Sequence, residues 1–211
     1  MGIGHRKKQQ SFFNSSSKHK LCHGGTLRQA RAGRGARPLS TKEPLHLVFK
    51  VNRAELKFGL RSGPCQKIVF QIIQKYSTQF FVKIDQISIQ NDHCHLLVRA
   101  TRRSHFHHFS RVTAGQIAQR FEKQGLLRSK AKTTLIKTSR KSSVTGTPRT
   151  QIHKGTGLWK HRPFSRVVRG WRAYKIAKDY IRLNEFEATG QLPYRKERLR
   201  GLSSIEWELF G

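Results

Sequence analysis

Apolar and polar residues alternate in four segments of the central part of the chain, the pattern of half-buried β-strands. These segments are Leu45 to Val51, Phe80 to Ile89, His93 to Ala100 and Trp159 to Val168. Asn91 and Asp92 separate the second segment from the third and predict a tight turn, so these two strands form a hairpin. Pro163 cannot donate to a sheet ladder, so the last strand is expected at an edge or a bulge.

Three further segments space their apolar residues three and four positions apart, the period of an amphipathic helix. They open at Gly63-Pro64, at Ser104 and at Ala173, and Gly190 and Pro193 supply the stop for the last helix. The order strand, helix, strand, strand, helix, strand, helix predicts an α+β fold with a ferredoxin-like antiparallel sheet. Helices on one face of that sheet would leave the other face for a ligand or partner.

Charge narrows the class of partner. The 211 residues include 43 Lys and Arg against 11 Asp and Glu, a formal net charge of +32. Self-repulsion on this scale opposes the compact state, so we infer a polyanionic partner, with nucleic acid favoured over a membrane surface or an acidic protein. The sequence contains no apolar run of about 18 residues, so a bilayer-spanning segment is not expected.

The basic residues gather in two acid-free runs, before Glu43 and from Lys123 to Lys178. We expect a basic, flexible arm over residues 1–43, a domain over residues 44–190 with a basic loop insert at residues 126–157, and a C-terminal tail over residues 191–211. The candidate DNA contacts are Arg31, Arg34, Arg37, Arg102, Arg103, Lys160, Arg162 and Arg166. Exposed aromatic residues can stack on unpaired bases. Trp159 and Trp171 are candidates, as are Phe106 and Phe109, which are expected in the core.

Cysteine usage indicates the compartment. Cys22, Cys65 and Cys94 are odd in number and lack C-x-x-C spacing, so neither a disulfide scaffold nor a four-cysteine zinc site is expected. The N-terminal residues contain no apolar signal stretch. A reducing compartment, the bacterial cytoplasm with association to the nucleoid, is the expected location.

The triplet His93-Cys94-His95 carries the most specific chemistry. Side chains two apart on a strand share a face, so both imidazoles converge while Cys94 points away. Two imidazoles at this spacing can hold a divalent ion and leave positions open for water and a phosphate oxygen. The alternative is a pair of surface histidines in a chain that has 11 histidines.

A tyrosine and an asparagine on the last helix complete a candidate site. Tyr180 and Asn184 are four positions apart and share a helix face. A phenol can attack phosphorus, but with an ordinary pKa of about 10 it needs a metal to polarise the phosphate. Asn184 offers an amide oxygen as a third ligand. The alternative for Tyr180 is an aromatic side chain packed on the sheet.

In this combination the chain resembles a known family. His93-Cys94-His95 followed by Leu96, after the turn at Asn91-Asp92, resembles the His-hydrophobic-His motif of the HUH single-tyrosine transposases. The resemblance is closest to the REP-associated tyrosine transposases of bacteria, members of the IS200-like superfamily. It covers residues 44–190, and includes the helix with Tyr180-Ile181 and Asn184.

The resemblance implies a single-strand DNA endonuclease that cleaves and rejoins hairpin-associated DNA through a 5′-phosphotyrosine, with Mg²⁺ or Mn²⁺ as cofactor. It implies that Tyr180 is the nucleophile and that His93, His95 and Asn184 are the metal ligands. The partner that the resemblance implies is single-stranded or hairpin DNA, and both a homodimer and a monomer are compatible with the sequence. Asp92 and Cys94 stand where this group often has Asn and an aliphatic residue, and the basic insert is longer than expected.

Three other interpretations remain open at the level of the sequence. A non-catalytic nucleic-acid-binding protein, for example a ribosome-associated one, explains the charge equally well. A domesticated relative could bind hairpins without mobilising itself. A structural zinc module would use Cys22, His23 and Cys65, or the cluster His105, His107 and His108.

Overall fold

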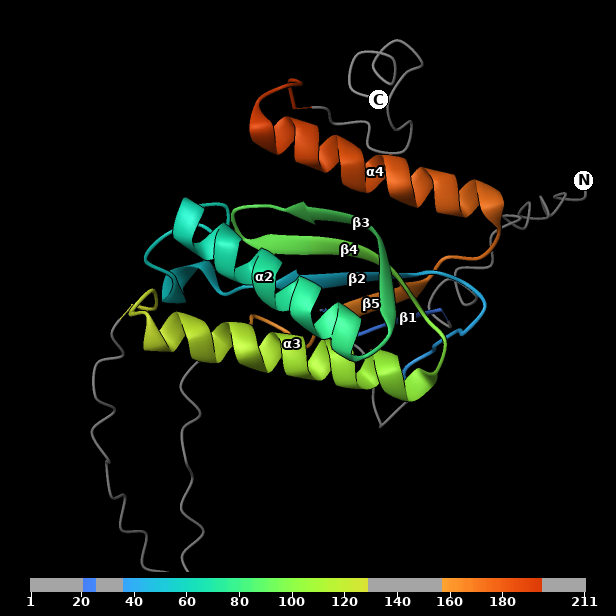
Figure 1. The fold of residues 1–211 in the computed structure, drawn as a ribbon. Coiled ribbons are helices and arrows are strands. Elements are labelled where there is room, and N and C mark those ends of the chain that lie inside the picture. Colours follow the sequence, from blue (N-terminus) through green and yellow to red (C-terminus); the bar gives the residue numbers. More distant parts are fainter. Residues whose placement is uncertain (1–20, 26–35, 129–156, 195–211) are drawn as a thin grey trace, which may run out of the picture.

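Five strands form one antiparallel sheet in the computed structural model, which describes residues 21–25, 36–128 and 157–194 (Figure 1). In spatial order the strands are β1 (Cys22–His23), β5 (Phe164–Val167), β2 (Leu45–Lys50), β4 (His93–Ala100) and β3 (Val82–Ile89). The four longer strands have the ferredoxin-like arrangement that the sequence predicts, with the first strand between the last and the third. Strand β1 is an addition of two residues, too short to show a pattern in the sequence.

Strand β5 is shorter than the predicted segment Trp159–Val168. It begins directly after Pro163, and Trp159 forms only an isolated bridge with Val51. Strand β1 pairs with the outer side of β5, where Gly24 turns the chain closely past Pro163. A Cβ atom at Gly24 would lie 2.2 Å from the Pro163 carbonyl oxygen, and φ is +84°, so this corner requires glycine.

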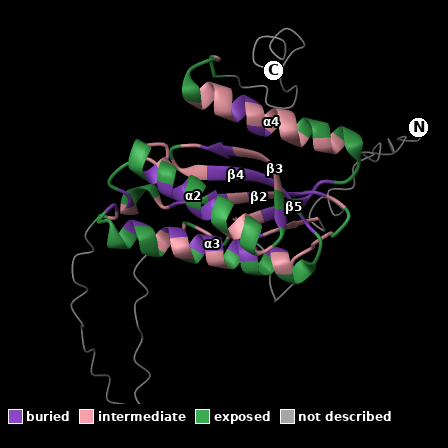
Figure 2. Cartoon of the chain, in the orientation of Figure 1, coloured by how far each residue is buried: buried purple, intermediate pink, exposed green. Residues whose placement is uncertain are grey.

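Helices α2 (Gly63–Gln79) and α3 (Arg103–Lys123) cover one face of the sheet (Figure 1). A 3-10 turn, η2 (Arg53–Glu55), precedes α2. The exposed residues of both helices lie on the sides away from the sheet (Figure 2). Phe106 and Phe109 are buried, as predicted, in a core that also contains Phe49, Ile73, Cys94, Leu96, Ile117 and Phe121.

Helix α4 (Trp171–Thr189) lies on the opposite face of the sheet (Figure 1). The predicted packing of helices on one face of the sheet holds for α2 and α3. Helix α4 instead covers the other face, which was expected to be open to a ligand or partner. A second apolar cluster joins Leu97 of β4 and Val168 to Ile181 of α4. The helix ends at Gly190, in the left-handed conformation at φ 76°, where the sequence places its stop.

Several of the predicted features lie outside the described residues. Arg31 and Arg34 are among them. So are most residues of the arm, most residues of the insert at 126–157 and most residues of the tail. Their predicted roles are therefore not addressed by the fold. In the part of the chain that is described, no helix is long and apolar enough to cross a membrane.

Candidate active site

His93 and His95 lie on the α4 side of β4, as strand alternation predicts. Their ring centroids are 4.6 Å apart and the rings are nearly perpendicular, at 88°. Between them, Cys94 points into the opposite core and is 1% exposed. Burial, with a smaller effect of the Glu185 charge, raises the pKa of the Cys94 thiol, so Cys94 stays protonated. The two faces of β4 therefore separate the imidazoles from the thiol.

Helix α4 brings Tyr180 over the histidine rings. The Tyr180 ring centroid lies 5.4 Å from that of His95, edge to face at 81°. Tyr180 also joins the apolar cluster around Leu97, which holds α4 against this face of the sheet. One chain therefore supplies both the tyrosine and the imidazoles, from segments about 90 residues apart in sequence.

His46 of β2 belongs to the same cluster, although sequence reasoning did not single it out. Its Nε2 atom lies 3.0 Å from Nδ1 of His95, and the two rings stack with centroids 5.2 Å apart. Burial, helped by the positive charge of Arg166, lowers the pKa of His46 from 6.5 to about 4. His46 is therefore neutral at pH 7. The available signal was its place on β2, on the face opposite to the buried Leu45 and Leu47.

The turn before β4 orients His93. Its Nδ1 atom lies 2.5 Å from the Asp92 carboxylate, which also contacts the Lys50 ammonium at 3.4 Å. Burial alone would raise the pKa of Asp92, but the hydrogen bond and charge of His93, together with Lys50, lower it overall. The carboxylate is thus held ionised beside the His93 ring, an arrangement that fixes a ligand imidazole in many metal sites.

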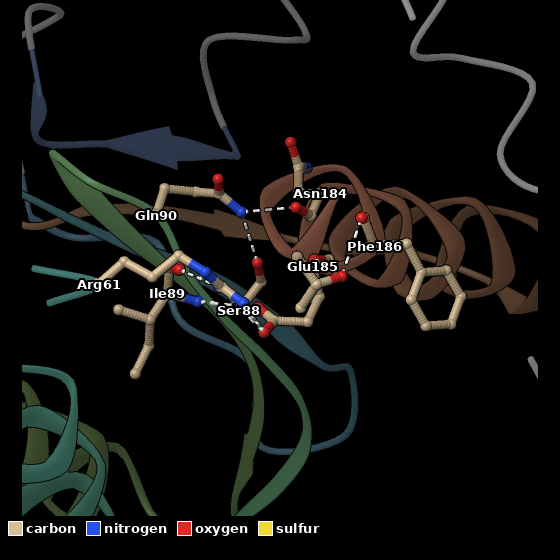
Figure 3. A network of polar contacts seen from close by, with 8 residues as sticks. Arg61, Ser88, Ile89, Gln90, Asn184, Glu185 and Phe186 are labelled. Carbon is tan, nitrogen blue, oxygen red and sulfur yellow. Dashed lines mark hydrogen bonds and ion pairs between the residues drawn. The ribbon is translucent and has the colours of Figure 1, made fainter. Parts of the chain in front are cut away.

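Asn184 is 7% exposed and lies one helical turn after Tyr180. Its side-chain amide donates to the Tyr180 carbonyl oxygen at 2.8 Å. The Gln90 amide donates both to the backbone carbonyl oxygen of Asn184 at 2.7 Å and to the Ser88 hydroxyl at 2.8 Å (Figure 3). Ser88 stands directly opposite His95 in the β3–β4 register. This chain of contacts ties Asn184 to the strand that adjoins the histidine pair.

A second polar link follows at the next residue of α4. The Arg61 guanidinium lies 3.0 Å from the Glu185 carboxylate and donates to the Ile89 carbonyl oxygen at 2.8 Å (Figure 3). The Ile89 N–H donates in turn to Glu185 at 3.3 Å. Helix α4 is therefore clamped to the end of β3 and to the segment that precedes α2.

The predicted DNA-binding cations occupy different environments. Arg166 is exposed and stands opposite His46 in the β2–β5 register, beside the histidine cluster. Arg37 instead donates to the Ser165 hydroxyl at 2.8 Å and to the Pro163 carbonyl oxygen at 3.0 Å. Burial, with the nearby charge of Arg162, lowers the pKa of Arg37. Arg37 is thus engaged within the fold, whereas Arg166 faces solvent at the site.

Four further predicted cations in the described residues are exposed: Arg102 and Arg103 at the start of α3, and Lys160 and Arg162 before β5. Of these, Arg103 donates to the Leu39 carbonyl oxygen at 3.4 Å. Of the candidate aromatics, Trp159 donates from its indole to the Ala114 carbonyl oxygen at 2.9 Å. Trp171 is 68% exposed.

The donor set suits a divalent cation bound partly by protein and partly by water. In the described part of the chain, no group of three or more His, Cys, Asp and Glu side chains is placed to hold a metal. The candidate ligands are instead two imidazoles, His93 and His95, and the amide of Asn184. These three protein ligands would leave further coordination positions of the cation open, which water and a phosphate oxygen could fill. The residues of the alternative zinc module do not form a group of this kind either.

The antiparallel α+β sheet carries histidines on a central strand, and the helix above them carries a tyrosine. The chain belongs to the IS200-like transposase family, whose model matches residues 42–154. That match covers β2 to α3, including His93 and His95, but ends before α4.

Two matches among solved structures are both to transposases or proteins described as such. A REP-associated tyrosine transposase bound to a REP hairpin is 15% identical, with a TM-score of 0.52 over 83% of this chain and 91% of that chain. A putative transposase from Deinococcus radiodurans is also 15% identical, with a TM-score of 0.37 over 74% of this chain and 98% of that chain. No curated protein matches the sequence.

Proposed function

We propose that the protein is a metal-dependent tyrosine endonuclease that cleaves and rejoins single-stranded DNA beside hairpins. The observation that carries this proposal is the position of the Tyr180 ring, 5.4 Å from the His95 ring within one chain. The His46 ring lies 6.1 Å from the same tyrosine, so the phenol stands beside two of the three clustered histidines. The chain belongs to a transposase family, and this supports a role of the cluster in DNA strand cleavage and transfer.

Tyr180 is the nucleophile in this reaction. Its phenolic oxygen attacks the scissile phosphorus and loses its proton, and the bond from phosphorus to the 3′ oxygen breaks. One fragment of the strand is then joined to Tyr180 through its 5′-phosphate, while the 3′ oxygen of the other fragment takes up a proton and leaves as a 3′-hydroxyl. Attack by a 3′-hydroxyl on the phosphotyrosine reverses the step and rejoins strands, so no external energy source is needed.

His93, His95 and Asn184 would hold Mg²⁺ or Mn²⁺. Bound there, the cation would polarise the scissile phosphate and offset the charge that develops in the transition state. His46 has a supporting role: because it is neutral, it can accept a hydrogen bond from Nδ1–H of His95. This choice of tautomer leaves the Nε2 lone pair of His95 for the metal. Asp92 orients His93 in the same way from the other side.

Single-stranded or hairpin DNA is the proposed substrate. The net charge of +32 supports binding to a polyanion through release of counterions. The similar REP-associated transposase is bound to a REP hairpin, which supports the hairpin class of substrate for this chain. Arg166 stands beside the histidine cluster, where it can contact a phosphate next to the scissile one. All the proposed catalytic groups come from one chain, an arrangement compatible with both a monomer and a homodimer.

The decisive experiment incubates the protein with single-stranded hairpin DNA and Mn²⁺ or Mg²⁺, and looks for a covalent protein–DNA band on a denaturing gel. We expect the band with the unmodified chain and with Tyr76→Phe, which changes a tyrosine on α2 across the sheet. We expect none with Tyr180→Phe. The double variant His93→Ala, His95→Ala should form little of the covalent adduct, and the small amount that remains should no longer depend on the divalent cation.

A covalent adduct that survives Tyr180→Phe would refute the assignment of the nucleophile. Tight binding of the hairpin without any adduct would instead identify a non-catalytic binder, such as a domesticated relative. A quantitative binding assay on the same samples separates these two outcomes.

A further inference from the structure

Trp171, the first residue of α4, is a large aromatic side chain that neither the core nor the proposed chemistry uses. It is 68% exposed, yet its ring stacks on Tyr174, with centroids 5.4 Å apart and planes inclined by 26°. Leaving an indole in water costs free energy, and a preformed exposed stack is typical of a surface that binds another ring.

The stack is anchored to the sheet from below. The Arg99 guanidinium of β4 lies 4.9 Å from the Tyr174 ring centroid. Arg99 is held in turn by a 2.6 Å hydrogen bond to Asp85 of β3. The planar groups of Arg99, Tyr174 and Trp171 therefore form a series that begins on the sheet and ends in solvent. Because its inner members are fixed, little conformational freedom remains to be lost when a ligand stacks on the outer ring.

A hollow of about 310 Å³ lies against this stack, lined by Trp171, Tyr174, Lys175, Lys178 and Asp179. Its walls combine aromatic surface with two ammonium groups and one carboxylate. The Lys175 ammonium lies 5.4 Å from the Trp171 ring centroid, on a flexible and exposed side chain that can turn to a phosphate. A carboxylate repels an anion and accepts hydrogen bonds, so the hollow suits a base with its phosphates outside, beside the lysines.

We propose that this hollow binds one unpaired base of the DNA strand that leads to the cleavage site, with Trp171 stacked on the base. The identity of the polyanion as DNA rests on the proposed function. Trp171 and Tyr180 are nine positions apart on one helix, about 13 Å along its axis. The bound base would therefore lie a few nucleotides from the scissile phosphate, and it would fix the register of the strand. Aromatic stacking on single strands tolerates any base, because every base has a π-face.

The test measures binding to a hairpin that carries a single-stranded extension, with an abasic nucleotide placed at each extension position in turn. The full chain with Tyr180→Phe is used in chelator, so that no cleavage occurs. Removing the base at one position should weaken binding by about 5- to 150-fold, the usual effect of losing one base–aromatic stack. Trp171→Ala should weaken binding of the intact strand by a similar factor, and should then be insensitive to the abasic nucleotide at that position.

Two control variants complete the design. Trp171→Phe should restore most of the affinity, since a smaller ring still stacks. Phe70→Ala removes an aromatic side chain that is 40% exposed on α2, across the sheet, and should leave binding unchanged. Thermal unfolding of each variant verifies that the fold is intact.

The inference is overturned if Trp171→Ala binds the intact strand normally, or if it loses affinity equally on every abasic strand. Both results are independent of the chemistry. A position-specific loss, together with no covalent adduct from the unmodified chain in Mn²⁺ or Mg²⁺, would support the base-binding hollow and refute the tyrosine endonuclease. An adduct without any position-specific loss would do the reverse.

Discussion

The Arg61 guanidinium lies 3.0 Å from the Glu185 carboxylate, and this ion pair joins α4 to the segment before α2. Both side chains are mostly shielded from water, with 18% and 29% of their side-chain surface exposed. Glu185 directly follows Asn184 and lies five positions after Tyr180, so the pair fixes the part of α4 that carries the candidate site. The pair also links the site to the end of β3, because both partners hydrogen bond to the Ile89 backbone.

Glu185→Gln should therefore slow the reaction as well as weaken the fold. The amide keeps the size of the side chain but loses the charge that Arg61 faces. We expect a decrease of about 1 kcal/mol in the free energy of unfolding, as for the loss of a partly exposed charged hydrogen bond. We also expect slower formation of the covalent adduct at saturating DNA, because the phenol would be less well positioned.

Chemical denaturation and single-turnover kinetics measure these two effects. Glu122→Gln, on the exposed side of α3, is the matched control and should alter neither. The expected decrease in the free energy of unfolding without any change in the rate of adduct formation would show that the pair has no role in positioning Tyr180.

Periodicity in the sequence was enough to predict which residues share a face within one element. The period of two places His93 and His95 together on β4, and the helical period places Tyr180 and Asn184 together on α4. The order of strands and helices predicted the ferredoxin-like sheet. That α4 crosses back over the histidines depends on packing between Leu97 and Ile181, a contact between segments that no local pattern encodes.

Contacts between distant residues account for the features that the sequence did not reveal. In the sequence, His46 is one polar position in an alternating strand. Its contact with His95 depends on the pairing of β2 with β4, which the local pattern does not encode. Arg61 is one of 43 cations and is separated from Glu185 by 124 positions. The same limit applies to Arg37, whose sequence context predicts a DNA contact but whose guanidinium hydrogen bonds to Ser165.

His46→Gln should weaken metal binding without removing a metal ligand. His46 lies 3.0 Å from Nδ1 of His95, and loss of such an outer partner typically reduces metal affinity by about 10- to 100-fold. The variant should need correspondingly more Mn²⁺ for half-maximal adduct formation, and should approach the normal rate at saturating metal. His108→Gln, on the exposed side of α3, should behave like the unmodified chain. An unchanged metal requirement for His46→Gln would remove His46 from the site.

Stability should decrease in mild acid because His46 is buried in its neutral form. The folded pKa is about 4, whereas the unfolded value is 6.5, so between these values the unfolded chain binds the proton and the folded chain does not. His46 thus contributes no penalty above pH 6.5, and the penalty grows as the pH falls toward 4. At pH 5 it amounts to about 2 kcal/mol relative to pH 7.5.

Urea denaturation at pH 7.5 and pH 5 tests this expectation. The unmodified chain should lose more stability than His46→Gln over this interval, because glutamine does not titrate. Equal losses in both proteins would mean that His46 is protonated or exposed in the folded state.

Arg166 and Arg37 should separate DNA contact from structural support. Arg166 is exposed beside His46, so Arg166→Gln should weaken hairpin binding and reduce the slope of log affinity against log salt by about 0.7 to 1, the loss of one phosphate contact. Its stability should barely change.

Arg37→Gln leaves the Ser165 hydroxyl and the Pro163 carbonyl oxygen without their partner, and should lower the free energy of unfolding by about 1–2 kcal/mol. Its salt slope should stay close to normal, since the guanidinium is already engaged within the fold. Fluorescence anisotropy at several salt concentrations, with thermal unfolding of the same samples, distinguishes the two arginines. If both variants reduced the slope equally, Arg37 would have to reach the DNA despite its contacts beside β5.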